Sequence, residues 1–229
     1  MKLGDSMSIY ESVFKDLFLT ILELIDYSYS EMLNDDVEFH LNKDGRDSLN
    51  NMPLENSITN RLVDYIRSNK KNYNLDLLGF EVEPGSDFSK EYATKGYIDI
   101  KVSNISSFFS KYNDETVYFA FECKRVNKSS KKTSQYIDEG INRFKINKYS
   151  KNVSLSGMIG YSEENYTGIP NIIKKINDKL VEETLSKNEE DIDINYAYCY
   201  ISTHSRENSD EITLYHLFFD FSDMIKQCN

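Results

Sequence analysis

Apolar side chains recur at helical spacing in the first part of the chain. Between residues 8 and 33 they fall three or four positions apart, at Val13, Leu17, Ile21, Leu24 and Ile25. This period is typical of an amphipathic helix. Residues 34–52 are polar and rich in turn-forming residues, so they are predicted to form a loop. A second helix is expected to begin at Pro53, because proline suits the first helical turn.

The middle of the chain favours strands. Three segments rich in β-branched and aromatic residues are bounded by polar turns, at 77–84, 96–102 and 117–126. The pattern then predicts a helix at 132–147, a strand at 153–161, a helix at 170–187 and late strands near 193–203 and 212–220. From residue 53 the order is α-β-β-β-α-β, followed by an α-β-β extension. This order predicts an α/β fold with a central mixed β-sheet flanked by helices.

A chain of 229 residues fits one decorated domain, or one domain with a small helical extension. We divide it into an N-terminal helix and polar loop at 1–52 and a domain at 53–229. No apolar run is long enough to cross a bilayer, and the N-terminus does not resemble a secretory signal. We therefore expect a cytoplasmic protein with no membrane partner.

Cysteine and histidine spacing limits the chemistry of any metal site. The three cysteines contain no CxxC pair, and the three histidines contain no HxxxH pair. This pattern argues against zinc and favours a hard cation held by oxygen ligands. His204 and Glu207 lie in 203–210, which is predicted to be a polar turn. Phosphate-binding GxxxxGK[ST] and GxGxxG patterns are absent, so no nucleotide cofactor is predicted.

The strand at 117–126 carries the first candidate chemistry. Alternation puts Tyr118, Ala120, Glu122 and Lys124 on one face and Phe119, Phe121 and Cys123 on the other. A carboxylate and an ammonium in an apolar strand are costly unless they are paired or used. These two residues alone fit a functional pair and a salt bridge at a strand end equally well.

A third charged residue points to a cation site. Asp99 lies between two isoleucines in the preceding strand, so a hairpin would bring it beside Glu122. Two carboxylates at low dielectric repel each other, and a divalent cation relieves that repulsion. The Cys123 carbonyl is a further candidate ligand, and Lys124 is a candidate for orienting the attacking water. The arrangement favours phosphodiester hydrolysis.

The pattern Asp99, then Glu122-Cys123-Lys124, on successive strands followed by an amphipathic helix resembles the PD-(D/E)XK nuclease superfamily. The resemblance covers residues 53–161, and the run from Phe121 also resembles uncharacterised bacterial members. Ile98 stands where the name of the family has proline, at a loosely kept position. The resemblance implies a restriction-endonuclease-like core and a Mg²⁺- or Mn²⁺-dependent endodeoxyribonuclease, with a role in restriction or antiphage defence.

The family often adds an acidic residue from the helix before the sheet, which makes Glu55 the candidate here. Glu55 lines up with Ile58 and Leu62, although a glutamate in a first turn is also favoured by the helix dipole alone. Some branches use a glutamine in the following helix, where Gln135 is the candidate. For Tyr136 beside it, core packing is the favoured interpretation. The roles of Glu55 and Gln135 stay open.

The charge distribution suggests a nucleic-acid contact despite a net charge of −11. From Lys124 to Lys151 there are nine basic residues and two acids, which leaves 18 basic and 36 acidic residues elsewhere. The candidates for phosphate contacts are Lys128, Lys131, Lys132, Arg143, Lys145 and Lys148. A charge run is also compatible with an ordinary solvated face.

DNA is the expected partner, although these residues do not distinguish it from RNA. A homodimer or another protein partner is compatible with the chain, since cutting two strands needs two sites. Two other hypotheses remain. In one, the nuclease fold is a catalytically silent binding or assembly module in a larger complex. In the other, the protein binds no nucleic acid and the charged triplet is a structural ion pair.

Overall fold

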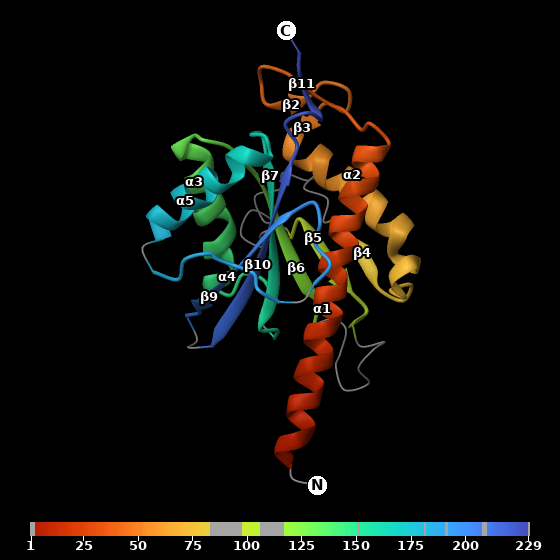
Figure 1. Cartoon of the computed structure of the whole chain (residues 1–229), viewed down its shortest axis with the longest axis vertical. Helices are drawn as coiled ribbons and strands as arrows, with labels where there is room; N and C mark the ends of the chain where they lie inside the picture. Colours follow the sequence, from red (N-terminus) through yellow and green to blue (C-terminus); the bar gives the residue numbers. More distant parts are fainter. Residues whose placement is uncertain are drawn as a thin grey trace, which may run out of the picture.

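The computed structural model describes residues 3–82, 98–105, 117–150, 152–180, 182–190, 192–207 and 210–228, with side chains from Ser12 onward. These residues form a mixed α/β fold with two mixed β-sheets flanked by helices (Figure 1). Within these ranges, no helix is both long and apolar enough to span a membrane.

The larger sheet has seven strands in the order β4-β5-β6-β7-β10-β9-β8. Their bounds are β4 Gly79–Glu81, β5 Ile100–Ser103, β6 Phe119–Val126, β7 Leu155–Ser162, β8 Ser186–Lys187, β9 Tyr198–Ser205 and β10 Glu211–Asp220. β6, β7 and β10 are parallel neighbours, whereas the outer strands pair antiparallel. The predicted central mixed sheet is therefore present.

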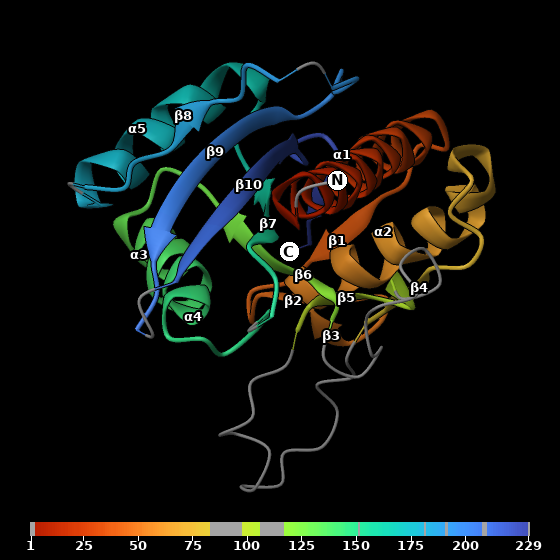
Figure 2. The same ribbon diagram turned by 90° about the horizontal axis from the view of Figure 1, so that it is seen from below.

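Helices cover both faces of this sheet (Figures 1 and 2). α1 (Leu3–Asn34) and α2 (Leu54–Asn69) pack with Phe119, Phe121 and Cys123 in one core. The second core, on the opposite face, contains residues of α3 (Ser130–Tyr136), a π-helix (Ile137–Ile141), α4 (Asn142–Lys145) and α5 (Ile169–Leu180). The two cores confirm the predicted alternation along β6, since Ala120 belongs to the second one.

A second, four-stranded sheet occupies the segment predicted to be a loop. Its order is β11-β1-β2-β3, with β1 Phe39–Leu41, β2 Arg46–Asp47, β3 Met52–Pro53 and β11 Ile225–Gln227. The loop prediction for 34–52 was wrong because each strand is too short to show a period, and β1 pairs with a strand from the other end of the chain.

Two predicted boundaries also shift. The helix expected at 170–187 ends at Leu180, and the Asn177 side chain then bonds both backbone groups of Leu185, which turns the chain toward β8. The strand expected from 193 begins at Tyr198. The preceding backbone N–H groups donate to the Asp26 carboxylate instead of a strand. Residues 83–84 and 96–97 of two predicted strands lie outside the described residues.

Candidate functional site

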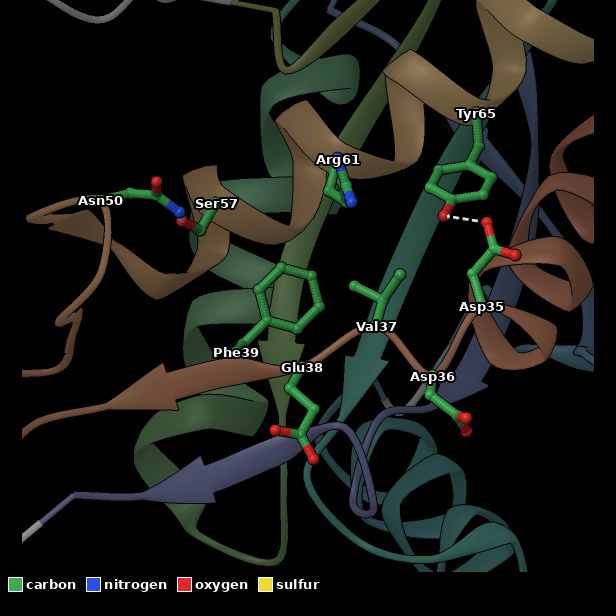
Figure 3. A pocket seen from close by; sticks show the side chains of 9 residues that line it. All are labelled: Asp35, Asp36, Val37, Glu38, Phe39, Asn50, Ser57, Arg61 and Tyr65. Atoms are coloured by element: carbon green, nitrogen blue, oxygen red, sulfur yellow. Dashed lines mark hydrogen bonds between the residues drawn. The ribbon is translucent and has the colours of Figure 1, made fainter.

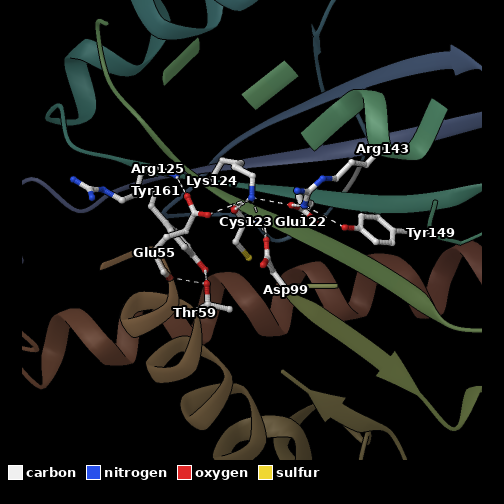
Figure 4. A network of polar contacts seen from close by, with 10 residues as sticks. All are labelled: Glu55, Thr59, Asp99, Glu122, Cys123, Lys124, Arg125, Arg143, Tyr149 and Tyr161. Atoms are coloured by element: carbon white, nitrogen blue, oxygen red, sulfur yellow. Dashed lines mark hydrogen bonds and ion pairs between the residues drawn. The ribbon is translucent and has the colours of Figure 1, made fainter. Parts of the chain in front are cut away.

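Charged side chains from separate elements meet around Glu122 and Lys124 of β6 (Figure 4). Glu55 comes from the first turn of α2, Asp99 precedes β5, Glu122 and Lys124 lie on β6, and Arg143 comes from α4. The sequence analysis placed the first four in one site, and the structure brings them together. The fifth, Arg143, was predicted as a phosphate contact.

The register of the β5–β6 hairpin explains the position of Asp99. Ile100 pairs with Phe121 in antiparallel register, so the residue before β5 falls opposite Glu122. The backbone N–H of Cys123 donates to Asp99 Oδ2 at 2.7 Å. The predicted hairpin therefore fixes this carboxylate against β6.

The Lys124 ammonium lies at the centre of the cluster. Its Nζ is 2.8 Å from Glu122 Oε1, 3.2 Å from Glu55 Oε1 and 3.5 Å from Asp99 Oδ2. It also donates to the Cys123 carbonyl at 2.9 Å. One cation thus bridges three carboxylates from three elements, and the interpretation of a simple pair at a strand end does not describe this arrangement.

Glu55 is anchored to the same strand. Its Oε2 accepts a hydrogen bond from the backbone N–H of Arg125 at 2.9 Å, while its Oε1 faces Lys124. Helix-dipole stabilisation alone does not require these contacts. The structure places Glu55 in the cluster.

Arg143 contributes a second cation to Glu122. Its guanidinium donates to Glu122 Oε1 and, at 3.2 Å, to the hydroxyl of Tyr149. Sequence periodicity gave no signal for this contact, because the π-helix before α4 adds a residue to the turn and shifts the face that follows. Arg143 was missed as a member of the cluster.

Burial governs the protonation of the carboxylates. The Glu122 side chain is 0% exposed, and burial, with the negative charge of Asp99, raises its pKa to about 8 against the opposing charges of Lys124 and Arg143. Burial likewise raises the pKa of Asp99, although Lys124 opposes it. Burial alone would lower the pKa of Lys124, but Asp99, Glu122 and Glu55 together raise it above its ordinary value. Lys124 therefore stays cationic.

Two observations indicate that the cluster fits an added cation. Within ion-pair distance, three carboxylates face only two cationic side chains, Lys124 and Arg143. In addition, Glu122 Oε2 is buried without a hydrogen-bond partner. Glu55, Asp99, Glu122 and the Cys123 carbonyl offer only oxygen, the donor type that Mg²⁺ prefers. Across the described ranges, no three acidic, imidazole or thiol groups are already gathered around one metal position, since Lys124 lies between the carboxylates.

The structure does not bring Gln135 to the site by a hydrogen bond. α3 begins at Ser130, capped by the Ser129 side chain, so Gln135 lies in the second turn of this helix. It is half-buried, and its side chain takes no part in the ion pairs of Lys124 with Glu55, Asp99 and Glu122. Tyr136 is buried and packs against Phe218, as the core interpretation predicts.

Acidic side chains from later in the chain neutralise much of the basic run. Lys128 pairs with Glu164 at 2.7 Å and Lys145 with Glu183 at 2.6 Å. Arg143 pairs with Glu122, as described above. These three side chains are therefore engaged in ion pairs, and their role as phosphate contacts stays a prediction. Ion pairs to described residues are absent for the remaining candidates, which are Lys131, Lys132 and Lys148.

His204 was wrongly predicted to lie in a polar turn. It is a fully buried residue of β9, and its Nδ1 lies 3.0 Å from Glu183 Oε2. The strand extends past the predicted end because His204 pairs with Ile212 of β10. This histidine belongs to a buried network of hydrogen bonds with Glu183, Ser202 and His216, and none of these is a residue of the cluster around Lys124.

A separate hollow of about 660 Å³ lies beside α2 (Figure 3). Asp35, Asp36 and Glu38 line one side of it, and Arg61 and Tyr65 of α2 line the other. The Tyr65 hydroxyl already donates to Asp35 at 2.6 Å. Most of these side chains are exposed, so the hollow lacks the buried, convergent charge of the cluster around Lys124.

No family model matches the chain, and no curated protein or solved structure matches it either.

Proposed function

We propose that the chain is a Mg²⁺- or Mn²⁺-dependent nuclease that hydrolyses phosphodiester bonds in DNA, on a restriction-endonuclease-like core. A role in restriction or antiphage defence is part of the same proposal. The observation that carries it is the convergence of Glu55, Asp99 and Glu122 on the Lys124 ammonium, beside an unpartnered carboxylate oxygen of Glu122. A purely structural ion pair needs neither the third carboxylate nor the free oxygen.

Glu122, Asp99 and Glu55 would hold the cation, with the Cys123 carbonyl as a further ligand. When bound, such an ion polarises a phosphate oxygen and lowers the pKa of a water molecule. Lys124 is the group expected to position that water or a phosphate oxygen, because its ammonium already faces all three carboxylates. Its raised pKa favours the role of hydrogen-bond donor over that of general base.

A catalytically silent module is the second candidate. It is favoured by the two cations that already neutralise Glu122, because a site that has lost its metal needs such replacements. Under this hypothesis the acidic surface serves as a docking face for a partner, and the cluster stabilises the fold.

Cleavage of plasmid and single-stranded DNA by the purified chain separates the two candidates. We expect cleavage with Mg²⁺ or Mn²⁺ that is lost in Glu122→Gln, which keeps the shape of the buried side chain. Glu163→Gln is the matched control, since it removes the same charge from a residue paired with Arg125 outside the cluster. Equal cleavage by wild type and Glu122→Gln would exclude the proposed site, and no cleavage by wild type would favour the silent module.

A further inference from the structure

Arg143 and Lys124 bind the same oxygen of Glu122 from different sides of the cluster. Lys124 extends from the middle of β6 and its side chain is 8% exposed. Arg143 comes from a four-residue helix, and its side chain is 27% exposed. Arg143 is therefore the more exposed of the two cations that bind a carboxylate that is itself 0% exposed.

The two cations also differ in how easily they can move. The stem of Lys124 lies against the π-helix, where a side chain added at Gly140 would come within 3.9 Å of its Cγ and within 2.5 Å of Met158 Cε. Arg143 is held at its tip by Glu122 and by the Tyr149 hydroxyl. Since an arginine has many rotatable bonds, these two contacts can be exchanged without moving the backbone.

We propose that Arg143 is a place-holder cation, which neutralises Glu122 before the metal binds and contacts a substrate phosphate once the metal is bound. This inference rests on the proposed nuclease function. The Glu122 carboxylate cannot remain buried and ionised without a counter-charge, and Arg143 supplies part of it. A planar guanidinium released beside the site is well suited to bind a phosphate group with two parallel hydrogen bonds.

Removing the charge of Arg143 should change the affinity for metal and the affinity for DNA in opposite directions. The positive charge of Arg143, which is bound to Glu122, competes with the dication for this carboxylate. Removing the charge of Arg143 therefore strengthens metal binding. Removing the same charge also takes away the phosphate contact, so binding of DNA weakens. A residue with only a structural role would weaken both when it is replaced.

Calorimetric titration with Mn²⁺ tests the first effect. Arg143→Gln removes the charge but retains an amide that can bond Glu122, and we expect it to bind Mn²⁺ about tenfold more tightly than wild type. Arg143→Met is a second neutral variant, expected to shift in the same direction. Arg143→Lys keeps the charge and should stay within about twofold of wild type. Lys187→Gln, an exposed residue of β8, controls for net charge and should leave the affinity unchanged.

Steady-state cleavage tests the second effect, with an expected rise of about tenfold in KM for DNA in both neutral variants. Equal or weaker Mn²⁺ binding by both neutral variants, alongside normal binding by wild type that Glu122→Gln abolishes, would overturn the place-holder role alone. Absence of Mn²⁺ binding by wild type would overturn the proposed function and this inference together.

Discussion

Replacing Ser202 with alanine should destabilise the fold more than any surface change, because a buried chain of hydrogen bonds passes through its hydroxyl. This series of hydrogen bonds begins at Glu183 Oε2, which lies 3.0 Å from His204 Nδ1, and continues from His204 Nε2 to Ser202 Oγ at 2.6 Å. Ser202 Oγ lies 2.7 Å from His216 Nε2, and His216 Nδ1 lies 2.9 Å from the Tyr136 hydroxyl. The two histidines and the tyrosine are 0% exposed.

The direction of each bond follows from the chemistry of its ends. A carboxylate only accepts, so His204 donates from Nδ1 to Glu183 and accepts at Nε2 when it is neutral. The Ser202 hydroxyl then donates to His204 and accepts from His216 Nε2–H. His216 in turn accepts at Nδ1 from Tyr136. Burial lowers the pKa of both histidines, which is consistent with these neutral forms.

Ser202→Ala leaves a buried N–H of His216 and a buried lone pair of His204 without partners. Each unsatisfied group costs about 1–3 kcal/mol, so the expected loss is about 2–6 kcal/mol in the free energy of unfolding. Equilibrium unfolding in urea measures this loss. Ser186→Ala on exposed β8 is the matched control, expected to change stability by no more than about 0.5 kcal/mol.

A loss below about 1 kcal/mol at an unchanged urea slope would refute the reasoning. It would mean that the two nitrogens find other partners, so the chain would not act as one connected network.

Three other changes test the account. Burial lowers the pKa of His204 and His216 in the folded protein. The free energy of unfolding should therefore be highest above the unfolded pKa of about 6.5 and fall as pH decreases, by up to about 1.4 kcal/mol per pH unit for each histidine. In urea unfolding of wild type and His216→Phe from about pH 7.5 to about 5.5, the free energy of unfolding should fall less steeply with decreasing pH in the variant. Gly157→Ala should lose about 1–3 kcal/mol in urea unfolding, because its new Cβ would lie 2.1 Å from Phe121 Cδ1, and an unchanged midpoint would contradict this packing. Lys124→Met should lower the free energy of unfolding, measured by thermal denaturation, by about 3–5 kcal/mol, because the buried Glu122 carboxylate loses its Lys124 counter-charge. A variant as stable as wild type would show that this ion pair is dispensable.

Local periodicity was sufficient to predict the centre of the fold and the core of the site. Alternation along β6 correctly assigned Phe121 to one face and Glu122 with Lys124 to the other, because a strand repeats every two residues. The hairpin between 96–102 and 117–126 was sufficient to bring Asp99 to Glu122. The α-β-β-β-α-β order is present from α2 to β7.

Features that depend on long-range contacts were not predictable in this way. The basic run was counted without the acids that neutralise it, since Glu164 and Glu183 come from elements that follow it in the chain. The contact of Arg143 with Glu122 depends on a π-turn, which leaves no periodic signal. His204 was misassigned because its partner in β10 lies beyond the polar segment that follows it.

The position of a bound cation tests the central claim most directly. Crystals soaked in Mn²⁺ should give one anomalous difference peak within about 2.5 Å of Glu122 Oε2 and an Asp99 oxygen, with Arg143 withdrawn from Glu122. A soaked crystal with no peak at the cluster, and with Lys124 still bridging the carboxylates, would contradict the assignment of this cluster as a metal site.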